Sequence, residues 1–379
     1  MEKVKRKSNY FIILLFIFLI IPFLSLSGIK NIISSNIYQA WQIISVAILL
    51  ILLIMKATKI KLNWSIGIFG IYQFIILFSS IFNNGISPGI ITVIVASVLI
   101  FTLLQTDYYD DMLSAVFIII IATLVINFLV MLINRNSVNT EYFIGGKNAL
   151  GIFLIPGLFL VIINSFEKYG KLSKFAVIVV ISSLLTIFIG SSGTGIVVAS
   201  CTILLLLLSI KFKPKKGLYL GIIFTVYALF LLFMDSFLLT EFWQKFTNFI
   251  GKDATLTSRT TIWKLAEELI KDNWFIGAGR GVELSYVNTW GVKQTIYEAH
   301  NFILEILMEG GIIALVLFAI LFFKTIKNLD FKDNRHKIIF IALCILLING
   351  LTESTINGFL VIIILSIACK YSIELKKQL

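Results

Sequence analysis

The chain has 379 residues, of which 59% are hydrophobic and only 14% are charged, and its mean hydropathy is +0.99. Soluble globular proteins have roughly 45–50% apolar and about 25% charged residues, so this composition excludes a soluble enzyme, a disordered chain and a disulfide scaffold. The net charge of +12 would suit nucleic acid, but its distribution along the chain argues against that partner. We therefore interpret the chain as an integral membrane protein.

The cysteines and the common nucleotide motifs add little chemistry. Cys201, Cys344 and Cys369 lie in apolar runs without a CxxC or a metal-ligand spacing, which predicts small core residues. No GxxxxGK[ST] motif is present, and this argues against a pump with its own nucleotide site. We expect neither a metal nor a cofactor.

Twelve apolar runs are candidates for membrane spans, since a span needs roughly 20 mostly apolar residues. The first eight hold almost no ionisable side chain in their interiors, which disfavours an ion-coupled transporter. The expected fold class is an all-α polytopic bundle of about 12 spans. The runs cover residues 9–28, 37–55, 63–82, 88–105, 112–133, 149–164, 174–190, 194–210, 217–236, 302–323, 337–352 and 355–370.

The positions of Lys and Arg orient this bundle. With the N-terminus in the cytoplasm, the inside segments carry 22 of the 32 Lys and Arg residues, the short outside loops carry 3 and the long outside loop carries 7. Cytoplasmic loops of membrane proteins show this excess. We expect a multi-pass protein of the cytoplasmic membrane, with both termini inside, the lipid bilayer as its surroundings and no nucleic acid as a partner.

The longest polar segment, residues 237–301, is expected outside the cell. It divides the chain into helices one to nine (1–236), an extracytoplasmic loop, and helices ten to twelve with a cytoplasmic tail (302–379). A loop of this length usually has a function. Apolar residues at helical spacing predict a helix from Arg259 onward, with Trp263 one turn after Arg259 on the same side.

Two further motifs follow that helix. The run FIGAGRG, 275–281, contains three glycines and Arg280; glycine permits tight backbone, and such a loop can present N–H groups to an anion. The run EAHNFILEILMEGG, 298–311, contains His300 and Asn301 at the entry to a span, and Glu305 and Glu309 one turn apart. Carboxylates so near hydrocarbon are expected to face protein or a wet cavity.

The residue types in this loop fit one kind of chemistry. Histidine is the side chain best matched to general base work near neutral pH, so His300 could take a proton from an attacking sugar hydroxyl. Arginine offers a planar, permanently charged fork for phosphate, so Arg259 and Arg280 could hold a diphosphate leaving group. Together they predict transfer from a phosphate-activated donor at the outer face of the membrane.

These motifs resemble the O-antigen ligase/polymerase family of membrane glycosyltransferases. The resemblance rests on R-x-x-x-W (Arg259, Trp263), on WFIGAGRG and on H-N-x-x-L-E-x-x-x-E-G-G from His300, and it covers roughly residues 255–320. It implies an undecaprenyl-diphosphate-linked oligosaccharide as substrate and metal-independent transfer. It also implies His300 as the base, Arg259 as a diphosphate ligand and a chain-length regulator protein as a partner.

One part of the family pattern is missing here. Many members carry an arginine after a serine at the outer end of an earlier span, whereas this chain reads GSSGT at 190–194. Arg280 or Lys147 is a candidate for the missing charge. Asn301, Glu305 and Glu309 are candidates for residues that support the site, and Glu353 in a later outer turn is a candidate of the same sort.

We predict a polymerase that joins lipid-linked repeat units into a cell-surface polysaccharide of the O-antigen or capsule type. The motifs do not separate it from a ligase, which passes the polysaccharide to another acceptor. A transporter or flippase for the same lipid-linked sugars is the competing class, and a non-catalytic membrane scaffold or sensor is the third. The sequence does not predict the identity of the sugars, their linkage, the length of the product or the oligomeric state.

Overall fold

The computed structural model describes residues 9–56, 63–84, 87–133, 141–190, 193–211, 215–238, 240–241, 245, 259–287, 292–355 and 358–376. Nearly all of the secondary structure in these ranges is helical, which confirms the all-α class. The elements before the polar segment are α1 (Tyr10–Ile20), η1 (Ile21–Phe23), α2 (Ser27–Lys30), α3 (Ser35–Lys56), α4 (Trp64–Asn84), α5 (Pro88–Leu103), α6 (Tyr109–Ile133), α7 (Lys147–Tyr169), α8 (Lys174–Gly190), α9 (Gly193–Lys211) and α10 (Lys216–Leu238).

The remaining elements carry the candidate site. They are α12 (Arg259–Asp272), β1 (Leu284–Val287), β2 (Lys293–Ile296), α13 (Phe302–Lys327), α14 (Asn334–Gly350) and α15 (Phe359–Lys376). The strands pair antiparallel, with Leu284 opposite Ile296 and Val287 opposite Lys293. This small hairpin was missing from our expectation of a partly helical loop, because its strands are too short for a clear alternating pattern.

Each of the twelve predicted runs overlaps a helix, but the number of spans stays a prediction. Among the described residues, five helices are long and apolar enough to cross a membrane, namely α3, α4, α6, α7 and α13. Several other apolar helices are shorter. Backbone N–H and C=O groups in lipid must be satisfied within the chain, which explains why apolar runs of this kind become helices.

The centre of the bundle is formed by α7, α14 and α15. The segment of α14 from 338 to 347 is buried throughout, and α7 packs against α6, α8, α9, α14 and α15. Large apolar side chains such as Phe74 on α4 and Ile189 on α8 instead point outward, 61% and 77% exposed. An apolar exterior of this extent suits contact with lipid chains.

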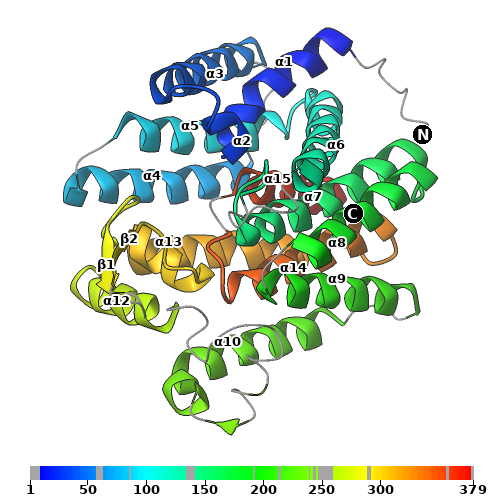
Figure 1. The fold of residues 1–379 in the computed structure, drawn as a ribbon. Coiled ribbons are helices and arrows are strands. Elements are labelled where there is room, and N and C mark those ends of the chain that lie inside the picture. The colour runs from blue at the N-terminus through cyan, green and yellow to red at the C-terminus, as the bar shows by residue number, and fades with distance from the viewer. Residues whose placement is uncertain are drawn as a thin grey trace.

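Helix α13 runs beside α4, and the outer elements α12 and β1–β2 lie against it (Figure 1). Asn301 caps α13 by accepting hydrogen bonds from the backbone N–H groups of Ile303 and Leu304, at 3.0 and 3.1 Å. This cap fixes where the helix begins, and therefore fixes the position of His300 immediately before it.

Candidate functional site

The first turn of α12 places Arg259 inside the protein. Thr260 is buried in this turn, and Arg259, Ile262, Trp263 and Ala266 are buried at helical spacing and form one face of α12. The apolar residues of that face belong to a small cluster that also contains Leu284 of the hairpin, Ala299 of the segment before α13, and Leu304 and Met308 of α13. The sequence prediction that Arg259 opens a helix and that Trp263 lies on the same side is confirmed.

Trp263 connects α12 to His300. Its ring is completely buried, and its Nε1–H donates to the His300 carbonyl oxygen at 3.3 Å. His300 has a φ of +49°, in the left-handed region that residues with a Cβ rarely adopt. The Trp263 bond on one side and the Asn301 cap on the other stabilise this backbone conformation.

Glu353 brings Arg259 and His300 together. It lies in the turn after α14, and its side chain is only 3% exposed. Nη2 of Arg259 donates to Oε1 of Glu353, while Oε2 of Glu353 lies 3.5 Å from Nδ1 of His300. A carboxylate between a guanidinium and an imidazole can stabilise the imidazolium that forms when the histidine accepts a proton.

Arg259 lies where helix starts converge. Its Nη1 donates to Oγ1 of Thr194 at 3.0 Å, in the first turn of α9, and Arg259 itself opens α12. The N-terminal end of a helix carries a partial positive charge and unsatisfied N–H groups, which favour anions. The two bonds to Thr194 and Glu353 use only two of the five N–H donors of the guanidinium.

Asn301 ties the start of α13 to the turn that carries Glu353. Besides capping the helix, its amide nitrogen donates to the Leu351 carbonyl oxygen at 3.1 Å, and its side chain is completely buried. Asn301 therefore holds the segments of His300 and Glu353 in register. Its expected support of a reaction at this site stays a prediction.

The glycine-rich loop docks onto a break in α13. Gly311 interrupts that helix with φ +61° and ψ −163°, and a Cβ on Gly277 would lie 2.5–2.6 Å from backbone atoms of residues 309–311. The Ala278 N–H donates to the Met308 carbonyl at 2.7 Å, and the Gly277 carbonyl accepts from Ser79 Oγ at 2.7 Å. The glycines thus permit close backbone packing, and the N–H groups of Gly277, Ala278 and Arg280 already donate to protein acceptors.

Arg280 forms a bidentate ion pair with Glu309. Its Nε donates to Oε1 at 2.8 Å and its Nη2 to Oε2 at 2.9 Å, with the Glu309 side chain only 2% exposed. The charge of Arg280 is therefore compensated within the protein, and the loop is fastened to α13. Its predicted contact with a diphosphate stays untested.

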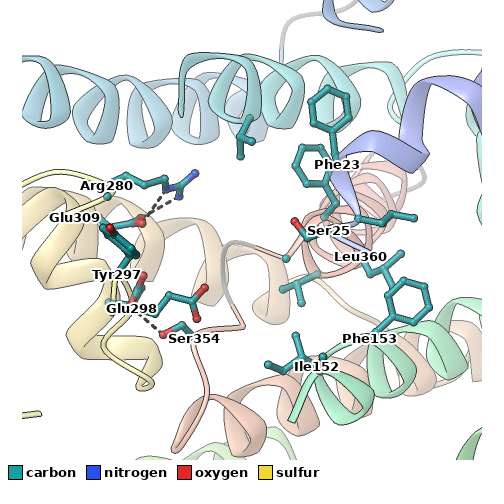
Figure 2. Close-up of a pocket in the computed structure, with 18 of the residues that line it drawn as sticks. Phe23, Ser25, Ile152, Phe153, Arg280, Tyr297, Glu298, Glu309, Ser354 and Leu360 are labelled. Carbon is teal, nitrogen blue, oxygen red and sulfur yellow. Dashed lines mark hydrogen bonds and ion pairs between the residues drawn. The ribbon is translucent and has the colours of Figure 1, made fainter. Parts of the chain in front are cut away.

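A cavity of about 450 Å³ lies beside this pair and next to the Glu353 turn. Figure 2 shows Arg280, Glu298, Glu309 and Ser354 on one side of it and Phe23, Phe153 and Leu360 on the other. Its lining comes from the segment around η1, from α5, α7, the loop before α13, α13 itself and the start of α15.

Glu305 stabilises the polar side of this cavity. Its Oε2 accepts from the Ala299 N–H at 2.6 Å and from the Ser354 hydroxyl at 2.9 Å. Glu305 and Glu309 are both 2% exposed or less and both line the cavity. This agrees with the expectation that carboxylates near hydrocarbon face protein or a wet cavity.

Glu298 is the carboxylate most open to the cavity. Displacement of water by the surrounding protein atoms raises its pKa, an effect that His300 opposes and that Glu353 and Glu309 reinforce. Glu298 is therefore electrostatically linked both to the His300 side of the site and to the Arg280–Glu309 pair.

The structure brings together most of the residues that we predicted, but in two groups. Arg259, His300 and Asn301 gather around Glu353, whereas Arg280, Glu305 and Glu309 line the cavity. The sequence analysis gave Glu353 too little weight; a carboxylate in the short turn between two apolar runs was the signal. Lys147 is exposed at the start of α7, and Ser191 lies outside the described residues.

The comparisons with known proteins agree with the motif resemblance. Residues 177–319 match the family model described as O-antigen ligase. This range includes α9, α12, the glycine-rich loop and His300, although Glu353 lies beyond it. No curated protein and no solved structure matches the chain.

Proposed function

The chain belongs to the O-antigen ligase/polymerase family through residues 177–319, and from this premise we propose that it polymerises lipid-linked oligosaccharides. Its substrates would be undecaprenyl-diphosphate-linked repeat units, and its product a cell-surface polysaccharide. The reaction would occur at the outer face of the cytoplasmic membrane, without a metal.

The observation that carries this proposal is the contact of Arg259 and His300 with the same carboxylate, Glu353. A cation beside two helix starts suits the diphosphate of the donor. A histidine within 3.5 Å of a buried carboxylate suits general base work. One buried turn thus joins a group for the leaving diphosphate to a group for the attacking hydroxyl.

The proposed reaction is a direct displacement at the anomeric carbon of the donor sugar. The acceptor hydroxyl loses its proton to His300 as its oxygen bonds to that carbon. The bond from the carbon to the diphosphate oxygen breaks, and Arg259 stabilises the negative charge that builds on the diphosphate. Glu353 stabilises the protonated His300, and a single displacement inverts the anomeric centre.

A ligase is the second candidate, because the matching family model carries that description. A ligase would use the same donor and the same base, and would differ only in the acceptor. The contacts of Arg259 and His300 serve both reactions equally. The choice between them therefore depends on the acceptor offered.

The test is a turnover assay with purified protein in nanodiscs, synthetic prenyl-diphosphate-linked repeat units and a chelator. Wild type should produce a ladder of polymers, and His300→Ala and Arg259→Ala should each abolish it. The matched control is Lys271→Ala, which removes an exposed positive charge from the last turn of α12. All variants are compared after their melting temperatures confirm folding.

Each outcome of this assay bears on a separate part of the proposal. A ladder from His300→Ala would refute His300 as the base and keep the enzyme. Transfer to a lipid-A core or protein acceptor in place of a ladder would assign a ligase. If no transfer product forms, the same protein is reconstituted into closed vesicles, and transbilayer movement of the substrate there would refute the glycosyltransferase and assign a flippase.

A further inference from the structure

The cavity beside Arg280 has two unlike walls. One wall is polar and includes Arg280, Glu298, Glu309 and Ser354, while the other is apolar and includes Phe23 and Phe153 (Figure 2). Glu305 also lines the cavity, and its Oε2 accepts from the Ser354 hydroxyl. Its volume of about 450 Å³ is within the range of roughly 300–1,000 Å³ that is typical of small-molecule sites. A sugar ring has a polar edge of hydroxyl groups and an apolar face of C–H groups, which matches a polar wall and an apolar wall.

The cavity adjoins the residues of the proposed reaction. Ser354 lines it, and Glu353 is the next residue along the turn. Glu298 lines it two residues before His300 and interacts electrostatically with that histidine. The Glu353 oxygen nearest to His300 is buried without a hydrogen-bond partner among the described residues. The cavity therefore borders the two segments that carry Glu353 and His300, although neither of these side chains is among its described lining residues.

The charges of the polar wall select what can enter. The Arg280 guanidinium is held by Glu309 through two bonds, and Glu305 accepts from Ala299 and Ser354. Glu298 remains as a carboxylate open to the cavity. Ionised carboxylates only accept hydrogen bonds, so this wall needs a ligand that brings donors.

Other charges near the cavity do not reverse this preference. Lys30, at the end of α2, interacts electrostatically with Glu298, but it does not line the cavity. Among the described residues that line the cavity, Arg280 is the one cation, and it pairs with the carboxylate of Glu309. A phosphate or carboxylate on the ligand would meet like charges here.

We propose that this cavity binds the acceptor sugar through its hydroxyl or amino groups and discriminates against acidic sugars. Glu298 accepts hydrogen bonds from the sugar, and the phenylalanine wall packs against its C–H face. The donor diphosphate binds instead at Arg259, which contacts Glu353 and does not line the cavity. This assignment rests on the proposed function, because it takes His300 as the base that the acceptor hydroxyl must reach.

The test measures binding and needs no turnover. Saturation-transfer NMR on protein in nanodiscs compares methyl glucoside and methyl glucosaminide with methyl glucuronide. Wild type should bind the uncharged and amino glycosides better than the glucuronide by about fivefold, as expected for one like charge at close range in a partly wet site. Glu298→Gln should narrow this difference, and Glu298→Lys should reverse it.

The matched control is Glu268→Gln, which makes the same change on the exposed side of α12 and away from the cavity. It should leave the preference unchanged. Equal binding of all three glycosides, an unaltered preference in Glu298→Gln, or the same change in Glu268→Gln would each overturn the inference. Displacement of the glycosides by geranyl phosphate, with no effect of Glu298→Gln, would assign the cavity to a lipid chain instead.

Failure of this inference is separable from failure of the proposed function. A polymer ladder that depends on His300, together with no glycoside binding in this cavity, overturns only the acceptor assignment. Selective glycoside binding without any ladder or transfer product refutes the enzyme and leaves a sugar site.

Discussion

Replacement of Glu353 by glutamine removes one charge from the centre of the site with almost no change in shape. Glutamine keeps an oxygen that can accept from Arg259, but it no longer carries the negative charge next to Nδ1 of His300. The variant therefore isolates the electrostatic part of the contact among Arg259, Glu353 and His300. Its expected effect is on the chemical step, because the imidazolium forms only there.

The size of the effect follows from the contacts. Hydrogen bonds to charged groups contribute about 1.5–3 kcal/mol, and each 1.4 kcal/mol in a barrier is roughly a tenfold change in rate. In the proposed mechanism His300 gains a positive charge whose Nδ1 lies 3.5 Å from Oε2 of Glu353, so loss of the Glu353 charge should lower kcat by about 10- to 100-fold. The KM for the donor should stay unchanged or fall, since Arg259 then faces one negative charge fewer.

The assay is steady-state polymerisation with the donor varied, alongside thermal melting of each variant. Glu353→Asp keeps the charge and should retain more activity than Glu353→Gln. Glu268→Gln, on the exposed face of α12, controls for a charge change elsewhere. An unchanged kcat in a folded Glu353→Gln variant would refute the role of Glu353. If Glu353→Gln and Glu353→Asp lost the same share of kcat and the same number of degrees in melting temperature, Glu353 would have a purely structural role.

Three further changes test other parts of the structure. Trp263→Phe removes the hydrogen bond to the His300 carbonyl but keeps the aromatic packing. It should lower the free energy of unfolding by about 0.5–1.5 kcal/mol, and it should lower turnover at temperatures where the variant is still fully folded. Gly277→Ala places a Cβ against the α13 backbone at a φ of +77°, and should destabilise by several kcal/mol in thermal melts, whereas Gly221→Ala, in an open helical position, should not. Burial raises the pKa of Glu298 above its value in the unfolded chain, so ionised Glu298 destabilises the folded protein; this cost is absent below the unfolded pKa and grows as pH rises through the folded pKa. Glu298→Gln should therefore melt higher than wild type at pH 7, and the difference should shrink toward pH 4; a difference that grows on acidification would contradict this sign.

The helices could be predicted from the sequence because a lipid environment leaves the backbone few alternatives. Apolar runs such as 88–105 and 302–323 coincide with α5 and α13, since every N–H and C=O must be paired within the segment. The cap at Asn301 before α13 was not part of the sequence prediction, which named this residue only as a candidate for supporting the site. The hairpin of β1 and β2 was missed because a pair of four-residue strands in a polar loop has no distinctive period.

The candidate site could be predicted only in part from the sequence. His300 and Arg259 were identified by residue type and motif, but their contact through Glu353 joins residues that are 53 and 94 positions apart from it. The glycine-rich loop was read as an anion nest, whereas its glycines serve packing against Gly311 and the α4 serines. Sequence patterns describe what one segment can do, and these outcomes depend on which segment lies opposite.

The sequence alone indicated a helical membrane protein with a long polar segment, whose residues 177–319 match the O-antigen ligase family model, because hydropathy and local motifs are properties of single segments. The tertiary structure alone decided that Arg259 and His300 both contact Glu353 and that Arg280 pairs with Glu309. It also decided that a cavity is lined by the Arg280–Glu309 pair on one side and by Phe23 and Phe153 on the other. Buried charges require partners, and a chain can supply those partners from any helix that the packing brings close.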